Sequence, residues 1–396
     1  MGGKSGWAAT EVVRRALSAA SFAVVARFLS LEDFAVFAVV SAAFAMLLTV
    51  AQSSADRVLV RTWLFDESHG RVAARLSTWS SLVATGVATL VLVALGDTPL
   101  AVVVALYGAS STGQVALWAE ENRQRAVGEL GSSNRLKTVG EVLPALGRAV
   151  GAVIAGTLLG ACAGAALAAI PLYVLGRRQL LPPAPGRQLR RAGRELAISS
   201  AIGAGTSAYW RIDLFLLAAL TDARAVAMYA LAGRGLEIAL VLPSVYGQLS
   251  IAEFLGGPRA ARKAWDQGRV LIRTGFALAL LGVVLALPLA AAVHAVLHKP
   301  MNPVVICLLA LTIPFAFYGG VLGNVVYASR QETLLLKTVL LMLVVNIAMN
   351  LPLIPWLGAS GAALTTALTE AAGLGCLAWQ LKPTVRRLTS LPEGGS

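Results

Sequence analysis

Long runs of apolar residues, separated by short polar segments, follow one another along the whole chain. They lie at roughly 8–30, 35–52, 73–95, 99–118, 138–158, 160–176, 196–220, 225–249, 271–297, 303–328, 333–356 and 359–381. Each run is about as long as an α-helix must be to cross the hydrocarbon core of a bilayer. The pattern therefore predicts an all-α membrane protein with about twelve transmembrane helices.

The composition agrees with this pattern and narrows the chemistry. The 396 residues are 57% hydrophobic and 13% charged, with a mean hydropathy of +0.73, whereas soluble domains carry about 25% charged residues. A soluble protein is excluded on this basis. Cys162, Cys307 and Cys376 lie far apart inside apolar runs and form no CxxC or Cys/His cluster, so we expect neither disulfides nor a metal site. No nucleotide-binding motif is present, and we expect no cofactor.

The net charge of +13 first suggests a nucleic-acid partner, but the positions of the basic residues point elsewhere. With the N-terminus in the cytoplasm, the terminal and inward-facing segments hold 27 of the 33 Lys and Arg residues. The outward loops hold Arg27, Arg224 and Lys299, and the other three lie within spans. This positive-inside distribution predicts a multi-pass protein of the bacterial cytoplasmic membrane with both termini in the cytoplasm. The basic ends are expected to meet anionic membrane lipids, not nucleic acid.

The chain divides near its middle into two halves of six spans. We expect an N-terminal lobe over residues 1–178, a basic, proline-rich cytoplasmic linker over 179–195, and a C-terminal lobe over 196–396. Two weak internal matches support a duplication: Asp33–Val40 resembles Ala225–Ala232 at an offset of 192, and Gly164–Leu167 resembles Gly361–Leu364 at an offset of 197. Such repeats are typical of alternating-access transporters whose site lies between the halves.

Four charged residues interrupt two apolar spans: Arg211 and Asp213 in 196–220, and Arg234 and Glu237 in 225–249. If all four side chains faced lipid, the free-energy cost of placing their charges in the hydrocarbon core would be roughly 12 kcal/mol. They are therefore expected to face the protein interior or a watery cavity, which makes them the first candidates for a functional site.

Helix geometry constrains these four residues further. Arg211 and Arg234 are about equally far from the turn near Thr221–Asp222, roughly 15 Å below the outer surface. Glu237 lies three residues after Arg234 on the same helical face and can pair with it. Asp213 points about 200° away from Arg211, so one of the two is expected to bind a neighbouring helix. Two alternatives stay open for each charge: a structural ion pair, or direct contact with a substrate or ion.

Other polar residues within the spans are weaker candidates. Arg148 lies in the fifth span, and Glu370 in the last span is either a proton site or a hydrogen-bonded structural carboxyl. Asn346 and Asn350 are expected to bridge helices. Arg14 and Arg15, near the start of the first span, can extend their side chains towards the membrane surface. Only eleven residues separate Arg15 from Arg27, so the first span is also expected to be partly shielded.

Three segments resemble bacterial polysaccharide flippases of the multidrug/oligosaccharidyl-lipid/polysaccharide exporter superfamily. Arg27–Ala38 resembles the loop between their first two helices, although Ala35 stands where glycine is common. Tyr209–Leu220 followed by Ala225–Arg234 is similar to their seventh and eighth helices, and Trp356–Thr365 to the Gly/Ala-rich start of their last helix. The resemblance covers the whole topology, although the chain is rather short for the group.

The resemblance implies two six-helix bundles around a central cavity, and an oligosaccharide on a polyprenyl diphosphate as the substrate moved to the outer leaflet. Arg211, Arg234 and Arg148 are then the expected contacts of this lipid-linked anionic glycan, because arginine matches phosphate oxygens. Asp213, Glu237 and Glu370 are expected to couple transport to a proton or sodium gradient. A glycan polymerase or glycosyltransferases would be partners in polysaccharide biosynthesis.

Three other functions fit the sequence less well. A drug antiporter of the same superfamily would need an acidic, cation-binding cavity. A major-facilitator transporter needs a Gly-x-x-x-Asp-Arg-x-Gly-Arg loop, and Asp56–Arg57 here lacks both glycines. A membrane glycosyltransferase or polymerase would place catalytic groups on large outer loops, and the outer loops here are very short. We therefore expect a transporter and not an enzyme.

Overall fold

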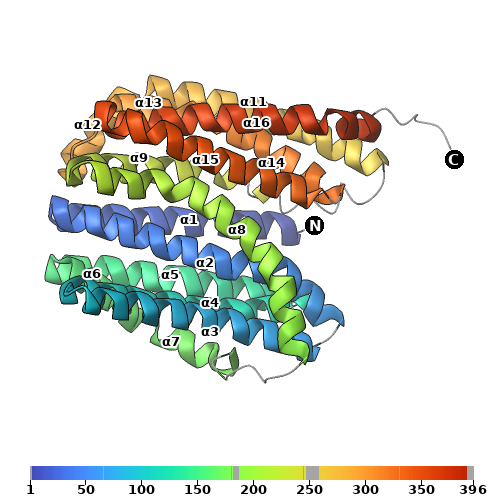
Figure 1. Cartoon of the computed structure of the whole chain (residues 1–396), viewed down its shortest axis with the longest axis horizontal. Coiled ribbons are helices and arrows are strands. Elements are labelled where there is room, and N and C mark those ends of the chain that lie inside the picture. The colour runs from blue at the N-terminus through green and yellow to red at the C-terminus, as the bar shows by residue number, and fades with distance from the viewer. Residues whose placement is uncertain are drawn as a thin grey trace. The chain divides into compact units, whose positions relative to one another are not determined.

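The computed structural model describes residues 2–65, 67–127, 129–179, 181, 187–243, 245–246, 258–329 and 331–389. Throughout these residues the regular elements are helices (Figure 1), which confirms the predicted all-α fold class. Ten of the described helical segments are long and apolar enough to cross a membrane. The two remaining expected spans, 8–30 and 196–220, fall in helices α1 (Gly2–Phe28) and α8 (Arg187–Leu220). The expected number of about twelve spans is thus accounted for.

The chain forms two compact units. The N-terminal unit is Ala16–Arg211, and the C-terminal unit is Met1–Arg15 together with Ile212–Ser396.

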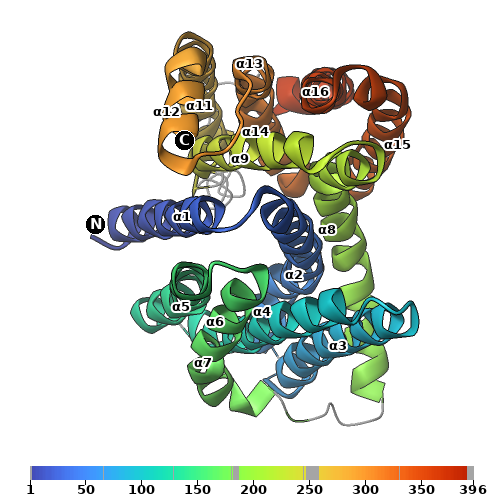
Figure 2. The ribbon, with the colours of Figure 1, turned by 90° about the vertical axis from the view of Figure 1, so that its left-hand side faces the viewer.

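In the N-terminal unit α4 (Thr98–Ala126) is the central helix. It packs against α2 (Leu31–Phe65), α3 (Glu67–Ala94), α5 (Leu130–Ala155), α6 (Leu158–Ala168) and α7 (Ile170–Leu175). A short 3₁₀ turn, η1 (Arg177–Gln179), follows α7. Figure 2 views this bundle nearly along its helices. Because α4 is surrounded, its membrane span is more buried than that of any other candidate span.

In the C-terminal unit the last helix has the corresponding role. The helices of this unit, besides the end of α8, are α9 (Ala223–Ala239), α11 (Pro258–Val284), α12 (Ala286–Leu297), α13 (Pro303–Ala310), α14 (Ile313–Ala328), α15 (Glu332–Leu357) and α16 (Ala359–Thr389). Helix α16 packs against α9, α11, α13, α14 and α15. Polar residues on α16 can therefore reach several other helices.

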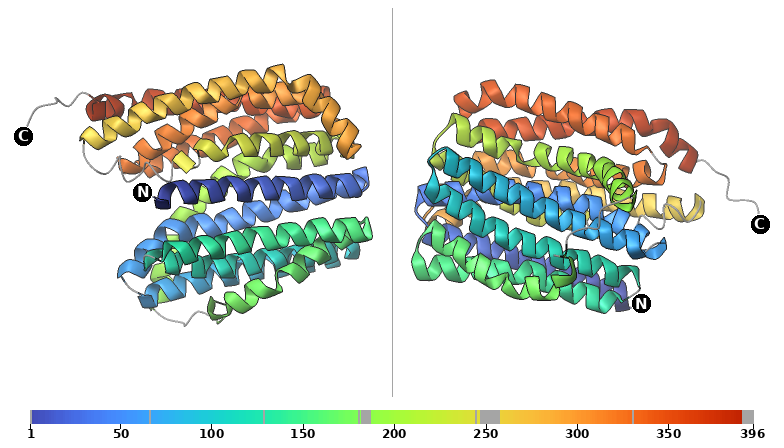
Figure 3. Two further views of the ribbon diagram at one scale, coloured as in Figure 1. Left: turned by 180° about the vertical axis from the view of Figure 1, so that it is seen from behind. Right: turned by 60° about the horizontal axis from the view of Figure 1, so that its bottom comes forward.

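Three predicted spans, 160–176, 271–297 and 303–328, each consist of two helical segments and not one continuous helix. The interruptions fall at Ala169, at Leu285 and at residues 311–312, and the α11–α12 pair can be followed in Figure 3. Pro171, Pro288 and Pro314 stand near the start of the second segment in each case. Proline donates no backbone hydrogen bond and its ring clashes with the preceding turn, which explains the breaks.

Two exposed tryptophans lie on the α15–α16 hairpin. Trp356, near the C-terminal end of α15, is 87% exposed, and Trp379 on α16 is 76% exposed. Trp379 lies twenty residues after Ala359, about 30 Å along the helix, which is the thickness of the hydrocarbon core. Tryptophan favours the two membrane interfaces, so this spacing fits a helix that spans the bilayer.

Candidate functional site

A buried polar cluster in the C-terminal unit has Asp213 at its centre. The Asp213 side chain is 1% exposed. Its Oδ1 atom accepts a hydrogen bond from Asn350 Nδ2 at 2.7 Å. Its Oδ2 atom accepts from the hydroxyl of Tyr229 at 2.7 Å and that of Thr366 at 2.6 Å. The carboxylate of α8 is therefore held by donors from α9, α15 and α16.

Two helical hairpins bring these side chains to one depth. Asp213 and Tyr229 lie eight and seven residues from the turn at Thr221–Asp222, and Asn350 and Thr366 each lie eight residues from Gly358. At ~1.5 Å per residue, all four are about 12 Å from the ends of their helices at these turns.

The turns themselves are fixed by local chemistry. The Asp222 side chain caps α9 by accepting from the Ala225 N–H at 2.9 Å. Gly358 has φ +57°, and a Cβ on Gly361 would overlap the Leu353 carbonyl oxygen, so both glycines are needed for the α15–α16 turn.

The cluster continues along α15 and α16 and leaves buried oxygens without partners. Asn350 Nδ2 also contacts Asn346 Oδ1 at 2.8 Å, and Asn346 Nδ2 contacts Thr369 Oγ1 at 3.5 Å. Asn350 Oδ1 and Thr365 Oγ1 are buried and have no hydrogen-bond partner. Buried oxygen atoms are normally paired, and an orphaned one points to a missing proton, water or ion.

The oxygen atoms of this cluster are suitable ligands for a monovalent cation or a proton. Besides the Asp213 carboxylate it offers the amide oxygens of Asn346 and Asn350 and the hydroxyls of Thr365 and Thr366. Hard cations take such oxygen ligands. One carboxylate supplies one negative charge, which a single proton or alkali ion neutralises. Rotation of the Asn350 amide by half a turn would present its orphaned oxygen to such an ion.

The expected Arg234–Glu237 pair is formed on one turn of α9. Arg234 Nη1 donates to Glu237 Oε2 at 2.6 Å, and the two side chains are 23% and 35% exposed. Each charge therefore has its partner on its own helix, as the three-residue spacing predicted. The pair neutralises much of the positive charge that Arg234 would offer to an anion.

Arg148 has a different environment in the N-terminal unit. Its Nη1 atom donates to the Tyr107 hydroxyl at 3.3 Å, and its guanidinium carbon lies 5.7 Å from the centroid of that ring. Tyr107 in turn donates to Ser41 Oγ at 3.1 Å. In the described part of the chain Arg148 forms no ion pair. A half-buried arginine held by a phenol keeps a full positive charge available to an anion.

The remaining candidates are less informative. Arg211 and Glu370 are both half-buried, and each makes a further interaction. Glu370 directly follows Thr369 on α16, so it lies beside the Asp213 cluster in sequence. The geometric expectation for the Arg211–Asp213 pair is confirmed, because Asp213 binds the neighbouring helices.

Of the two arginines expected to extend towards the membrane surface, the expectation for Arg14 is wrong. The Arg14 side chain does not extend to the surface; it is 1% exposed and pairs with Glu11, which is 4% exposed. Arg15, by contrast, is 49% exposed and contacts the same carboxylate at 3.3 Å. The sequence reasoning overlooked Glu11, although its three-residue spacing from Arg14 signals a pair on one helical face.

Comparison with solved structures identifies the fold. The chain matches a lipid II flippase MurJ in the inward closed conformation with a TM-score of 0.75 and 11% identity, over 97% of this chain and 90% of that chain. It matches an inward-facing multidrug resistance MATE family transporter of the MOP superfamily with a TM-score of 0.70 and 13% identity, over 95% and 96%. It matches the Vibrio cholerae MATE transporter VcmN in the bent form with a TM-score of 0.60 and 16% identity, over 98% and 100%.

These matches span nearly the whole chain in each case. No protein-family model matches the sequence, and no curated protein matches it. At these identities the TM-scores show a shared fold, and this is the fold that the sequence resemblance implied. The substrate has to be argued from the residues.

Proposed function

We propose that this protein is a cation-coupled membrane transporter that moves a polyprenyl-diphosphate-linked oligosaccharide from the cytoplasmic to the outer leaflet by alternating access. The observation that carries the coupling is the Asp213 cluster, with its buried carboxylate and two orphaned oxygens. The shared fold supports transport: one similar structure is described as a lipid II flippase. The product would serve cell-surface polysaccharide synthesis, with glycosyltransferases and a polymerase as partners.

The coupling step follows from the hydrogen bonds of Asp213. Without an ion, three donors hold the carboxylate. A bound proton or sodium ion would take the place of some of the hydrogen bonds to the carboxylate. Helices α9, α15 and α16 would therefore pack differently around α8 in the ion-free and ion-bound states. Ion binding can shift a conformational equilibrium only through such a difference between states.

The substrate's anionic headgroup needs a cation that is not already neutralised. Arg148 meets this need best, because its contacts are a phenol ring and hydroxyl. Arg234 can serve only if the substrate competes with Glu237 for its guanidinium. Arg211 stays a third candidate. We therefore rank Arg148 first for the diphosphate, a change from the sequence-based order.

A drug exporter of the same superfamily is the second candidate. Multidrug transporters share the fold, and the Asp213 carboxylate alone would be compatible with an organic cation. Arg148 and Arg234 favour an anionic substrate. The two functions separate in one assay, since an exporter would move a cationic dye and ignore a polyprenyl diphosphate.

Purified protein reconstituted into liposomes tests the proposal. The probe is a polyprenyl diphosphate with a fluorescent head group, and the liposomes carry a sodium or a proton gradient. We expect Asp213→Asn to abolish the dependence of flipping on the gradient, because the neutral amide removes the one negative charge that the cation would neutralise. Arg148→Gln is expected to weaken the apparent substrate affinity about tenfold or more, the loss of one charge-assisted contact.

The control variants change the same chemistry at exposed positions. Asp266→Asn and Arg269→Gln alter an exposed pair on α11 and should flip the probe as the unaltered protein does. Gradient-dependent flipping by Asp213→Asn at the normal rate would overturn the coupling site. Export of a cationic dye without flipping of the lipid would establish the second candidate instead.

A further inference from the structure

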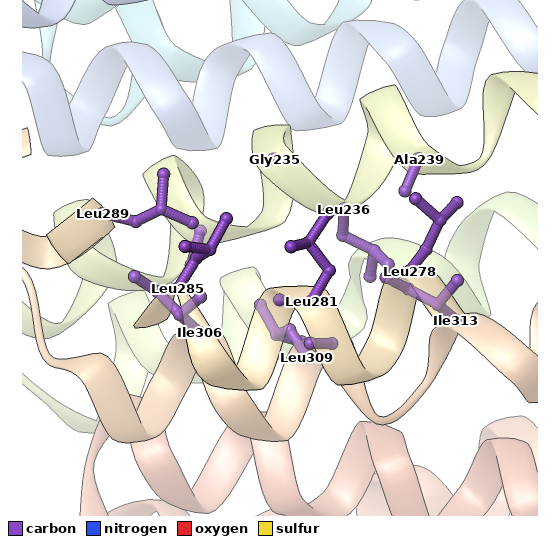
Figure 4. Close-up of a pocket in the computed structure, with 13 residues that line it drawn as sticks. Gly235, Leu236, Ala239, Leu278, Leu281, Leu285, Leu289, Ile306, Leu309 and Ile313 are labelled. Carbon is purple, nitrogen blue, oxygen red and sulfur yellow. The ribbon is translucent and has the colours of Figure 1, made fainter. Parts of the chain in front are cut away.

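An apolar groove lies between three helical segments of the C-terminal unit (Figure 4). Its volume is about 220 Å³. Its thirteen lining residues are all leucine, isoleucine, alanine or glycine, and come from α9, from α11–α12 and from α13–α14. The side chains of this wall offer no hydrogen bond, so the groove fits a hydrocarbon better than a sugar or a phosphate.

The two sides of the groove differ in exposure. Leu236, Leu309 and Ile313 form a buried inner wall, at 8%, 3% and 6% exposed, whereas Leu281 and Leu289 are 50% and 44% exposed. The groove is therefore open along one side. From Leu278 to Leu289 it follows eleven residues, about 16 Å of helix, so it can hold an extended segment of an aliphatic chain.

Gly235 keeps the groove open. It lines the groove, and a Cβ placed on it would meet no atom within 4 Å. Glycine inside a helix costs about 1 kcal/mol relative to alanine, and no neighbouring atom requires it here. A larger side chain at this position would point into free space and fill it.

The groove and a candidate headgroup contact lie at the same depth. Arg234 directly precedes Gly235 on α9, twelve residues after Asp222, which is about 18 Å below the outer end of the helix. Ordinary phospholipids keep their phosphates at the membrane surface. A lipid whose phosphate is drawn to this depth during transport brings the first part of its chain to the level of the groove.

We propose that this groove binds the isoprenoid chain of the transported lipid next to its phosphate. The inference rests on the proposed function and adds a recognition element to it: the transporter selects its substrate by the chain as well as by the anionic head. The rest of the chain stays in the bilayer, because the groove is short.

Equilibrium binding to the full-length protein in lipid nanodiscs tests this inference. The probes are a long-chain polyprenyl monophosphate and dioleoyl phosphatidic acid, which share a phosphate but differ in their chains. We expect Gly235→Leu to weaken binding of the polyprenyl monophosphate about tenfold, the effect of roughly two methylene groups losing their burial. Binding of phosphatidic acid should be weaker in the unaltered protein and unchanged in the variant.

Two control variants separate a filled groove from a general effect of a new side chain. Gly235→Ala leaves most of the groove open and should bind normally. Gly86→Leu adds the same bulk on α3, at an exposed glycine with nothing within 4 Å, and should also bind normally. Thermal melting should show all three variants at least as stable as the unaltered protein, because a Cβ at either glycine meets no atom within 4 Å and a helix is stabilised when glycine is replaced.

Each contrary result has a distinct meaning. Normal binding of the polyprenyl monophosphate by Gly235→Leu, with weaker binding by Arg148→Gln, would overturn the groove and leave the proposed function standing. Equal binding of both probes, lost together in Gly235→Leu, would make the occupant an acyl chain and overturn the inference. Failure of the unaltered protein to bind either probe would overturn the substrate class as well.

Discussion

At the scale of single residues, the Glu11–Arg14 pair should have a large effect on stability. Both side chains are almost fully buried, so Glu11→Gln leaves an arginine charge inside the protein without its carboxylate. Breaking such a pair costs on the order of 3–5 kcal/mol. We expect a clear fall in the melting temperature of the detergent-solubilised protein, followed by tryptophan fluorescence.

Neighbouring substitutions check the cause of that fall. Arg15→Gln should change the melting temperature little, because the Arg15 side chain is 49% exposed and exposed pairs contribute about 0–1 kcal/mol. Replacing both partners, Glu11→Leu with Arg14→Met, should recover much of the loss, since an apolar pair removes both buried charges. A Glu11→Gln protein that melts like Arg15→Gln would show that the Glu11–Arg14 pair stabilises the protein no more than an exposed pair does.

The Asp213 cluster shows how far residue-level reasoning from the sequence can go. Equal distances from two turns place Asp213 opposite Tyr229, and Asn350 opposite Thr366, so each half of the cluster was predictable by counting. The contact between the two hairpins was not predictable, because the apolar faces of similar helices do not determine which residues of the two hairpins lie against each other. Asp213 could thus be recognised as bound to a neighbour, but its partners needed the structure.

At the scale of elements, glycines decide how closely α5 and α6 pack. A Cβ on Gly151 would overlap the carbonyl oxygen of Gly160, and one on Gly147 would overlap that of Gly164. Small residues spaced four apart allow such backbone contact between membrane helices. We expect Gly151→Ala to separate the helices and to destabilise the protein by about 1–3 kcal/mol, measured as a lower melting temperature.

A second glycine of the same helix provides the control. A Cβ on Gly131 would meet no atom within 4 Å, so Gly131→Ala should stabilise α5 by up to about 1 kcal/mol. Equal behaviour of the two variants would mean that helix propensity, and not the α5–α6 contact, governs the effect.

The helix ends and breaks show the limit of span prediction at this scale. Helix α2 continues to Phe65, beyond the apolar run that ends near 52, and α8 begins at Arg187, before the run that begins near 196. Arginine and other polar residues are good helix formers in water, but a search for apolar runs stops where they begin. The breaks at Ala169 and Leu285 lie inside apolar runs. They can be predicted only if the nearby prolines are taken as helix breaks although the run of apolar residues continues.

At the scale of the whole molecule, the distribution of basic residues predicts which side of the membrane each helix end faces. A variant with Cys162, Cys307 and Cys376 replaced can carry a single new cysteine at Arg224 or at Arg178, both exposed. In intact cells an impermeant maleimide should label Arg224→Cys, which lies in an outer turn. Arg178→Cys should react only after the membrane is opened, while a permeant maleimide should label both.

The same experiment decides how the coupling ion reaches its site. With the predicted topology Asp213 lies about 12 Å from the outer ends of its helices, so an ion moving down an inward gradient meets the carboxylate in the outer half of the membrane. Labelling of Arg178→Cys from outside would invert every helix and place Asp213 in the cytoplasmic half. An ion moving down an inward gradient would then meet the carboxylate only in the inner half of the membrane.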